Sequence, residues 1–230
     1  MEVHINMIKQ SKIFEVYESE QGRRKQLCTI NLVPGQNVYG EKLVRENNVE
    51  YREWDASKSK LAASILKGSV NIGIRKNDVV LYLGSASGTT VSHVSDIVGQ
   101  DGFVFAVDIA PRVMRDLIFL CHSRKNIAPV LADAGKTNIL KERVSAVDVV
   151  YQDVAQKNQV EIFLKNVELF LKNDGYALLA LKARSMDVVK NPKQIFKDVR
   201  EKLEKAITII DCRELEPFQK DHCMFICKKK

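Results

Sequence analysis

Two hydrophobic patterns alternate along the chain from residue 58 to its C-terminus. Continuous apolar runs predict buried strands at 79–83, 103–108, 128–131, 147–151, 176–181, 206–210 and 222–227. Apolar residues at helical spacing predict helices at 58–67, 89–98, 111–123, 160–172 and 192–204. Because strands and helices follow one another in turn, the pattern predicts an α/β fold with a doubly wound, mostly parallel sheet of seven strands.

The first 53 residues have a different pattern and predict a small β-rich domain. Strands are expected over 12–17, 26–33 and 49–54, with a polar loop, Ser-Glu-Gln-Gly-Arg-Arg-Lys, between the first two. Three strands make a marginal sheet, which needs a further surface to pack on. We therefore predict two domains, a small N-terminal one over 1–53 and a larger one over 54–230.

A glycine loop follows the first strand of the larger domain. Gly84 and Gly88 bracket small residues, and the helix predicted from Thr89 begins directly after them. A strand, a loop and a helix in this order bring backbone N–H groups and a helix N-terminus toward a ligand. The spacing matches neither the dinucleotide motif G-x-G-x-x-G nor the phosphate loop, which also needs a lysine. The loop fits S-adenosylmethionine better than a dinucleotide.

Acidic side chains follow the next three strands, where ligands of open α/β sheets bind. Asp108 can accept hydrogen bonds from both ribose hydroxyls of an adenosyl ligand, or it can be an acid that favours the following helix N-terminus. Asp133 can accept a hydrogen bond from an adenine amino group, or it can be a turn aspartate. Asp153 and Gln156 follow the fourth strand, at the same edge of the sheet.

Two further polar residues are candidates for chemistry. Lys182 ends the fifth strand, which we expect to be central, and this position favours a charge-paired site lysine with Asp153 as its partner. His222 begins the last strand. If that strand runs antiparallel to the others, His222 lies on the same rim, although a histidine at a strand start is more often structural.

Composition narrows the class of protein further. The 230 residues are 45% hydrophobic and 28% charged, as in globular proteins, and the net charge of +7 favours a polyanionic partner such as nucleic acid. No apolar run approaches the roughly 18 residues that span a bilayer, and no signal peptide is evident. Five scattered cysteines indicate an intracellular, reduced setting. Cys223 and Cys227 lack a second close Cys/His pair, so we predict no metal site.

Seven segments in the same order resemble the fibrillarin family, from about residue 26 to the C-terminus. They are the glycine loop with its helix (83–96) and the shorter motifs at 51–55, 59–63, 110–115, 151–156, 182–185 and 216–222. The resemblance implies an S-adenosylmethionine-dependent RNA 2′-O-methyltransferase with the methyltransferase type of sheet and a small N-terminal β-rich domain. Such an enzyme would be the catalytic subunit of a box C/D guide ribonucleoprotein that modifies ribosomal RNA, and transfer RNA in archaea.

The resemblance also implies roles for particular residues. The catalytic set maps onto Lys60, Asp153, Lys182 and His222. The cofactor-binding set maps onto Gly84, Ala86, Gly88, Thr89, Thr90, Asp108, Ile109, Asp133, Ala134, Asp153, Val154, Ala155 and Gln156. In the expected mechanism Lys182, fixed by Asp153, lowers the pKa of the ribose 2′-hydroxyl. Lys60 adds positive potential, and His222 orients the ribose or relays its proton.

The implied partners are a box C/D guide RNA, its target RNA, a scaffold Nop-domain protein and a kink-turn-binding ribosomal-protein homologue. No membrane partner is expected. The chain lacks a glycine-arginine-rich N-terminal extension, so it resembles the archaeal type and a cytoplasmic location is expected; a eukaryotic form would be nucleolar.

Three alternatives stay open at this point. A stand-alone RNA 2′-O-methyltransferase is disfavoured by His222, which stands where that family has glutamate, and by the N-terminal β-rich segment. A non-catalytic RNA-particle subunit is disfavoured by the intact catalytic set. A nicotinamide dehydrogenase is disfavoured because G-x-G-x-x-G is absent.

Overall fold

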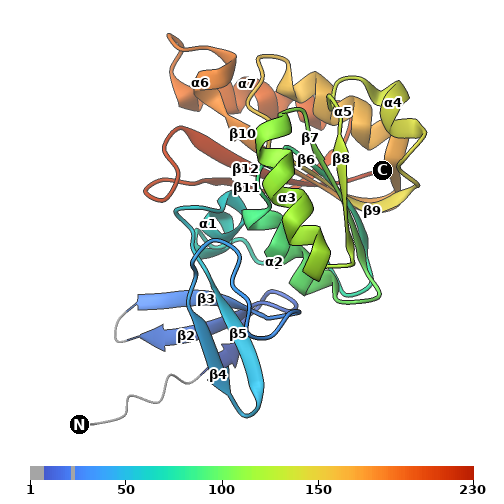
Figure 1. The fold of residues 1–230 in the computed structure, drawn as a ribbon. Helices are drawn as coiled ribbons and strands as arrows, with labels where there is room; N and C mark the ends of the chain where they lie inside the picture. Colours follow the sequence, from blue (N-terminus) through green and yellow to red (C-terminus); the bar gives the residue numbers. More distant parts are fainter. Residues whose placement is uncertain (1–7, 22–23) are drawn as a thin grey trace.

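The structure is a computed structural model that describes residues 8–21 and 24–230. These residues form two sheets with helices packed on the larger one (Figure 1). The smaller sheet is antiparallel, in the order β1-β2-β3-β5-β4. Its strands are β1 (Ile8–Gln10), β2 (Tyr17–Gln21), β3 (Arg24–Ile30), β4 (Leu43–Glu46) and β5 (Val49–Trp54).

The prediction of an N-terminal strand over 12–17 is wrong. The segment folds as a turn, in which the Ser11 hydroxyl and the Gln10 amide donate hydrogen bonds to the carbonyl of Ile13, and the backbone N–H of Ser11 bonds to Val16. The observed strand β2 begins at Tyr17 and includes part of the segment predicted as a polar loop. The middle of that loop, residues 22 and 23, lies outside the described residues.

The larger sheet confirms the predicted doubly wound arrangement. Seven strands lie in the order β11-β12-β10-β9-β6-β7-β8, and β12 alone runs in the direction opposite to the other six. They are β6 (Val79–Leu83), β7 (Phe103–Asp108), β8 (Ile127–Leu131), β9 (Val147–Gln152), β10 (Leu171–Lys182), β11 (Thr208–Glu214) and β12 (His222–Lys228). The chain order reverses on either side of β6, which is where such sheets bind ligands.

Helices cover both faces of the larger sheet (Figure 1). On one face, α1 (Lys60–Leu66), α2 (Thr89–Val98) and α3 (Pro111–Ser123) bury apolar side chains against alternate strand residues such as Tyr82 and Tyr151. On the other face lie α4 (Thr137–Lys141), α5 (Gln159–Phe170) and α7 (Pro192–Glu204). The remaining helix, α6 (Ala183–Met186), is a single turn after β10.

Helix α1 begins later than the sequence pattern predicts. Its N-cap is Ser59, whose hydroxyl accepts a hydrogen bond from the backbone N–H of Ala62. A serine side chain stabilises a helix start by satisfying one of the free N–H groups of the first turn. The cap makes Lys60 the first residue of the helix.

The smaller sheet packs against α2 through buried charged groups. The Asp96 carboxylate accepts hydrogen bonds from Arg52 at 2.9 Å and from Arg124 at 2.6 Å, and all three side chains are almost completely buried. Arg52 also pairs with Glu41 at 2.7 Å. Burial acts to raise the pKa of Glu41, but Arg52 and backbone N–H groups outweigh it and lower that pKa. These bonds join the smaller sheet to α2 and to the end of α3.

Two uncharged residues on the smaller sheet strengthen the same junction. The Thr29 hydroxyl donates a hydrogen bond to Asp96 at 2.8 Å and lies 2.8 Å from the imidazole of His93. The His93 ring stacks on Trp54, with ring centroids 4.8 Å apart. Because α2 directly follows the glycine loop, the junction also fixes the position of that loop relative to the smaller sheet.

Candidate functional site

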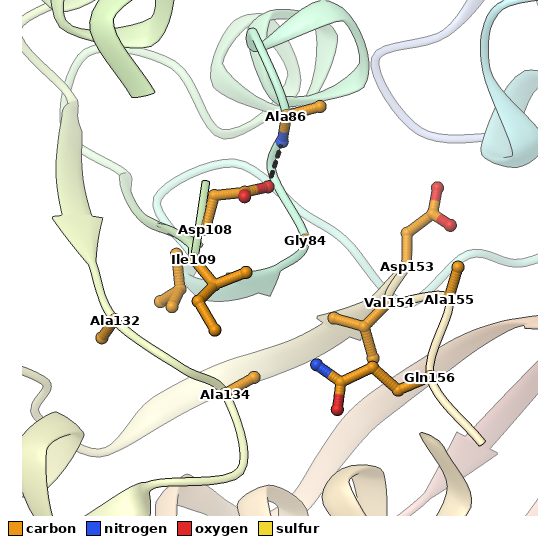
Figure 2. A pocket seen from close by; sticks show the side chains of 11 residues that line it. Gly84, Ala86, Asp108, Ile109, Ala132, Ala134, Asp153, Val154, Ala155 and Gln156 are labelled. Atoms are coloured by element: carbon orange, nitrogen blue, oxygen red, sulfur yellow. Dashed lines mark hydrogen bonds between the residues drawn. The ribbon is translucent and has the colours of Figure 1, made fainter. Parts of the chain in front are cut away.

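A cavity of about 290 Å³ opens at the carboxyl ends of β6, β7, β8 and β9. It lies beside the reversal point at β6, in agreement with the position predicted from the strand ends (Figure 2). Most of its lining residues are small or apolar, and two of them, Asp108 and Asp153, carry carboxylates. The lining residues are Gly84, Ala86, Val107, Asp108, Ile109, Ala132, Ala134, Asp153, Val154, Ala155 and Gln156.

Nine of the predicted cofactor residues therefore lie around one cavity. Val107 and Ala132 line it as well, although neither was among the cofactor residues predicted from the sequence. Each directly precedes a predicted aspartate at or just beyond the end of a strand, so its position beside that aspartate was the available signal. Both add apolar surface to the cavity, which suits an adenine ring.

Glycine is required at position 84 by its backbone and its surroundings. Its φ is +84°, and a Cβ there would lie 2.3 Å from the backbone oxygen of Asp153. The loops after β6 and β9 therefore approach each other closely at the base of the cavity. Any larger residue would force the two loops apart.

Asp108 fixes the glycine loop from the neighbouring strand. Its carboxylate accepts a hydrogen bond from the backbone N–H of Ala86 at 2.8 Å (Figure 2). It also accepts one from the backbone N–H of Ala110 at 2.9 Å. Asp108 thus binds the N-terminal end of α3, which is one of the two predicted roles, and it also lines the cavity, while its contact with a ribose stays a prediction. Each oxygen keeps a second lone pair, which can accept from a ribose hydroxyl.

Four predicted cofactor residues do not line this cavity. Asp133 accepts a hydrogen bond from the N–H of Gly135 at 2.8 Å, which is the turn role left open by the sequence. The Thr90 hydroxyl donates to Ser59 at 3.0 Å. Thr89 lines a different hollow, and Gly88 is the N-cap of α2 with a φ of +98°. These residues shape the loop next to the cavity, and their contact with a cofactor stays a prediction.

An ion pair joins the cavity to the polar rim beside it. Lys60 donates a hydrogen bond to Asp153 at 2.8 Å, and both side chains are about four-fifths buried. The partner predicted for Asp153 was Lys182, and that pairing is wrong among the described residues. Strand ends alone could not place Lys60, because it comes from α1, whose start was predicted two residues too early.

His222 begins β12, which runs antiparallel to β10, so the condition under which His222 would lie on the same rim is met. The residue is buried, and its Nδ1 lies 2.6 Å from the carbonyl oxygen of Lys220. A carbonyl only accepts, so Nδ1 carries the proton and Nε2 is left as an acceptor. Burial lowers the pKa of His222, and the charges of Lys60 and Lys182 lower it further, although Lys220 and Asp153 act against them.

Lys182 lies directly opposite His222 across the β10 and β12 pair. Its backbone is held by Gln159, whose side-chain amide bonds to both the N–H and the carbonyl of Lys182 at 3.2 Å. The Lys182 side chain is exposed to solvent, so its ammonium group is free to reach a bound molecule at the rim. Since the charges of Lys60, Asp153 and Lys182 all act on His222, the four predicted catalytic residues lie near one another, beside the cavity that Asp153 lines.

The arrangement combines a ligand cavity with a neighbouring group of lysines, a carboxylate and a neutral histidine. The cavity offers acceptor oxygens for hydroxyl or cationic groups and apolar surface for a ring. The rim offers positive charge and one unprotonated imidazole nitrogen, which together can bind and deprotonate a hydroxyl group.

Among the residues that the structure describes, none of the helices has the length and apolar character needed to span a bilayer.

The seven-stranded sheet with antiparallel β12, and a cavity at the ends of β6 and β7, is the fold of the S-adenosylmethionine-dependent methyltransferases. Within that class, the family model Fibrillarin matches residues 7–230. The chain belongs to the fibrillarin family.

Individual relatives agree over almost the whole length. A fibrillarin-like rRNA/tRNA 2′-O-methyltransferase from Methanosarcina barkeri is 53% identical over 222 residues, which is 95% of this chain and 96% of the relative. A fibrillarin from Aeropyrum pernix, solved with natively bound S-adenosyl-L-methionine, superposes with a TM-score of 0.89 at 43% identity, covering 96% and 97% of the two chains. A fibrillarin solved in complex with Nop5p has a TM-score of 0.84 at 39% identity, covering 95% and 99%.

Proposed function

We propose that the chain is an S-adenosylmethionine-dependent RNA 2′-O-methyltransferase and the catalytic subunit of a box C/D guide ribonucleoprotein. The observation that carries the proposal is the position of the Lys60–Asp153 pair, whose Asp153 lines the cavity and whose charges act on His222. The names of the relatives support ribosomal RNA and transfer RNA as substrates.

The cavity residues fit S-adenosylmethionine on three grounds. Asp108 keeps lone pairs for the ribose hydroxyls, while Val107, Ile109 and Ala132 provide apolar surface for the adenine ring. Asp153 lines the cavity and places a carboxylate near the cationic methionine end. When bound, the cofactor supplies a methyl group already activated on a positively charged sulfur.

The protein then has to orient the ribose 2′-hydroxyl and remove its proton. Asp153 fixes the Lys60 ammonium group at the rim, and the exposed Lys182 adds a second ammonium group that stabilises the developing oxyanion. His222 Nε2 accepts the proton, because Nδ1 is committed to the Lys220 carbonyl. In the expected mechanism Asp153 held Lys182 in place; here Asp153 holds Lys60 instead.

A scaffold and a guide RNA complete the proposed enzyme. The relative solved with Nop5p supports a Nop-domain scaffold as the protein partner. We infer that a box C/D guide RNA selects the target by base pairing, and that a kink-turn-binding ribosomal-protein homologue joins the same particle. The net charge of +7 supports contact with RNA phosphates, with an affinity that falls as salt rises. The archaeal relatives favour the cytoplasm as its location.

Two experiments separate this proposal from its alternatives. Calorimetry with S-adenosylmethionine tests the non-catalytic subunit, since a decayed subunit would give no binding heat. A methylation assay of the isolated chain tests the stand-alone enzyme. Sequence-selective methyl transfer without guide RNA and scaffold would contradict the proposed particle.

A further inference from the structure

Two cysteines meet across the outermost strands of the larger sheet, next to the rim. The sulfur atoms of Cys212 on β11 and Cys223 on β12 lie 3.2 Å apart. Strand β11 is an edge strand, and Cys212 is half-buried, whereas Cys223 is completely buried. The outer sulfur is therefore within reach of a small reagent, and the inner one lies directly behind it.

The surroundings make the two thiols chemically different. The hydrogen bond from Cys223 and the positive charge of Arg200 lower the pKa of Cys212, and together they outweigh burial and the charges of Asp211 and Glu214, which raise it. The same hydrogen bond and burial raise the pKa of Cys223. The thiolate is the reactive form of cysteine, so Cys212 is the nucleophile and Cys223 holds its proton until a second step.

We propose that Cys212 and Cys223 form a reversible thiol–disulfide site, and that its oxidation slows methyl transfer at the neighbouring rim. The oxidant is a low-molecular-weight disulfide. The Cys212 thiolate attacks one of its sulfurs, forms a mixed disulfide and releases one thiolate. Cys223 then loses its proton and attacks Cys212 Sγ, which releases the second thiolate. Two protein thiols are oxidised, and one small disulfide is reduced to two thiols.

The position of the pair explains why oxidation would reach the rim. A disulfide bond is about 2.0 Å long, so the two sulfurs must approach by about 1 Å. Cys212 and Cys223 are diagonal neighbours, because Cys223 pairs with Glu214, and diagonal positions are wide for a disulfide. The strands must therefore shift, and such a shift reaches His222, which directly precedes Cys223 in β12 and lies opposite Lys182.

The chemical half of the proposal is tested on the full chain with oxidised glutathione as the probe. The thiol count should fall from five to three, and peptide mapping should find one cross-link between Cys212 and Cys223 that dithiothreitol reverses. A Cys121→Ser variant, which removes another half-buried thiol, should form the same cross-link, and Cys212→Ser should form none. An unchanged count of five, or a cross-link through another cysteine, would overturn the site.

The second half rests on the proposed function, and a separate measurement tests it. Methyl transfer by the reconstituted particle should fall about a hundredfold on oxidation, as expected when a reacting group is misplaced by ~1 Å, and dithiothreitol should restore it. The Cys212→Ser particle should stay active under the same treatment. Full activity of a particle with a mapped disulfide would overturn the switch. If the reduced particle is inactive while the cross-link still forms, the proposed function fails and the thiol site stands.

Discussion

Replacing Asp96 with asparagine should destabilise the protein by about 3–5 kcal/mol, the cost of removing one member of a buried ion pair. Four groups donate to this carboxylate: Arg52 at 2.9 Å, Arg124 at 2.6 Å, the Thr29 hydroxyl at 2.8 Å and the Leu32 backbone N–H at 3.0 Å. Asparagine keeps the shape, but it leaves two buried guanidinium groups with only the Glu41 carboxylate to balance them. The loss is a large part of a typical folding free energy of about 5–15 kcal/mol.

Thermal and urea unfolding measure this effect. At about 2–4 °C per kcal/mol for a chain of this size, the Tm of Asp96→Asn should fall by roughly 6–20 °C. Asp198→Asn is the matched control, because Asp198 is exposed and pairs only with groups at the surface, so its effect should stay within about 0.5 kcal/mol. Equal unfolding curves for the two variants would refute the view that Asp96 joins the smaller sheet to α2.

Three other predictions concern the site. Gly84→Ala should weaken S-adenosylmethionine binding by at least tenfold in calorimetry, because the positive φ alone costs about 1–2 kcal/mol and the Cβ would also meet the Asp153 backbone; unchanged affinity would contradict the close approach. Lys182→Ala should bind the cofactor normally but lose about 10²–10³-fold in kcat in the reconstituted particle, and full activity would remove its role. Burial lowers the pKa of His222 below the ordinary value of 6.5, so its neutral form persists and methyl transfer should decline only below pH 6.5; a decline that begins above 6.5 would argue against neutral His222 as the acceptor.

The larger sheet was predictable because its signals are local and consistent. Each buried strand is a continuous apolar run, and prolines mark the first turns of α3 and α7, so both helices were predicted with the observed bounds. The antiparallel direction of β12 was an assumption at that point, and the pairing of Lys182 with His222 confirms it.

The N-terminal segment was less predictable for a physical reason. Its short strands carry many polar residues, and the side-chain bonds of Gln10 and Ser11 that form the turn leave no hydrophobic pattern. Strands β1 and β4 were missed because they are only three and four residues long. The domain boundary between residues 53 and 54 stays a prediction.

The site was predictable only in part, because some of its contacts join residues that are far apart in the sequence. Strand ends identified Asp108, Asp153 and Lys182, because the fold brings parallel strand ends together. The Lys60–Asp153 pair joins residues 93 positions apart through a helix, so no local pattern could reveal it. Whether each predicted side chain contacts the cofactor or the RNA stays a prediction.

Guided methylation by a reconstituted particle tests the central claim most directly. The chain is combined with a box C/D guide RNA, a Nop-domain scaffold, a kink-turn-binding protein, S-adenosylmethionine and a target RNA, and 2′-O-methylation is mapped along the target. We predict a single methylated ribose at the position set by guide pairing, which moves when the guide sequence is changed. Cofactor binding without methyl transfer, or methylation that does not follow the guide, would contradict the account.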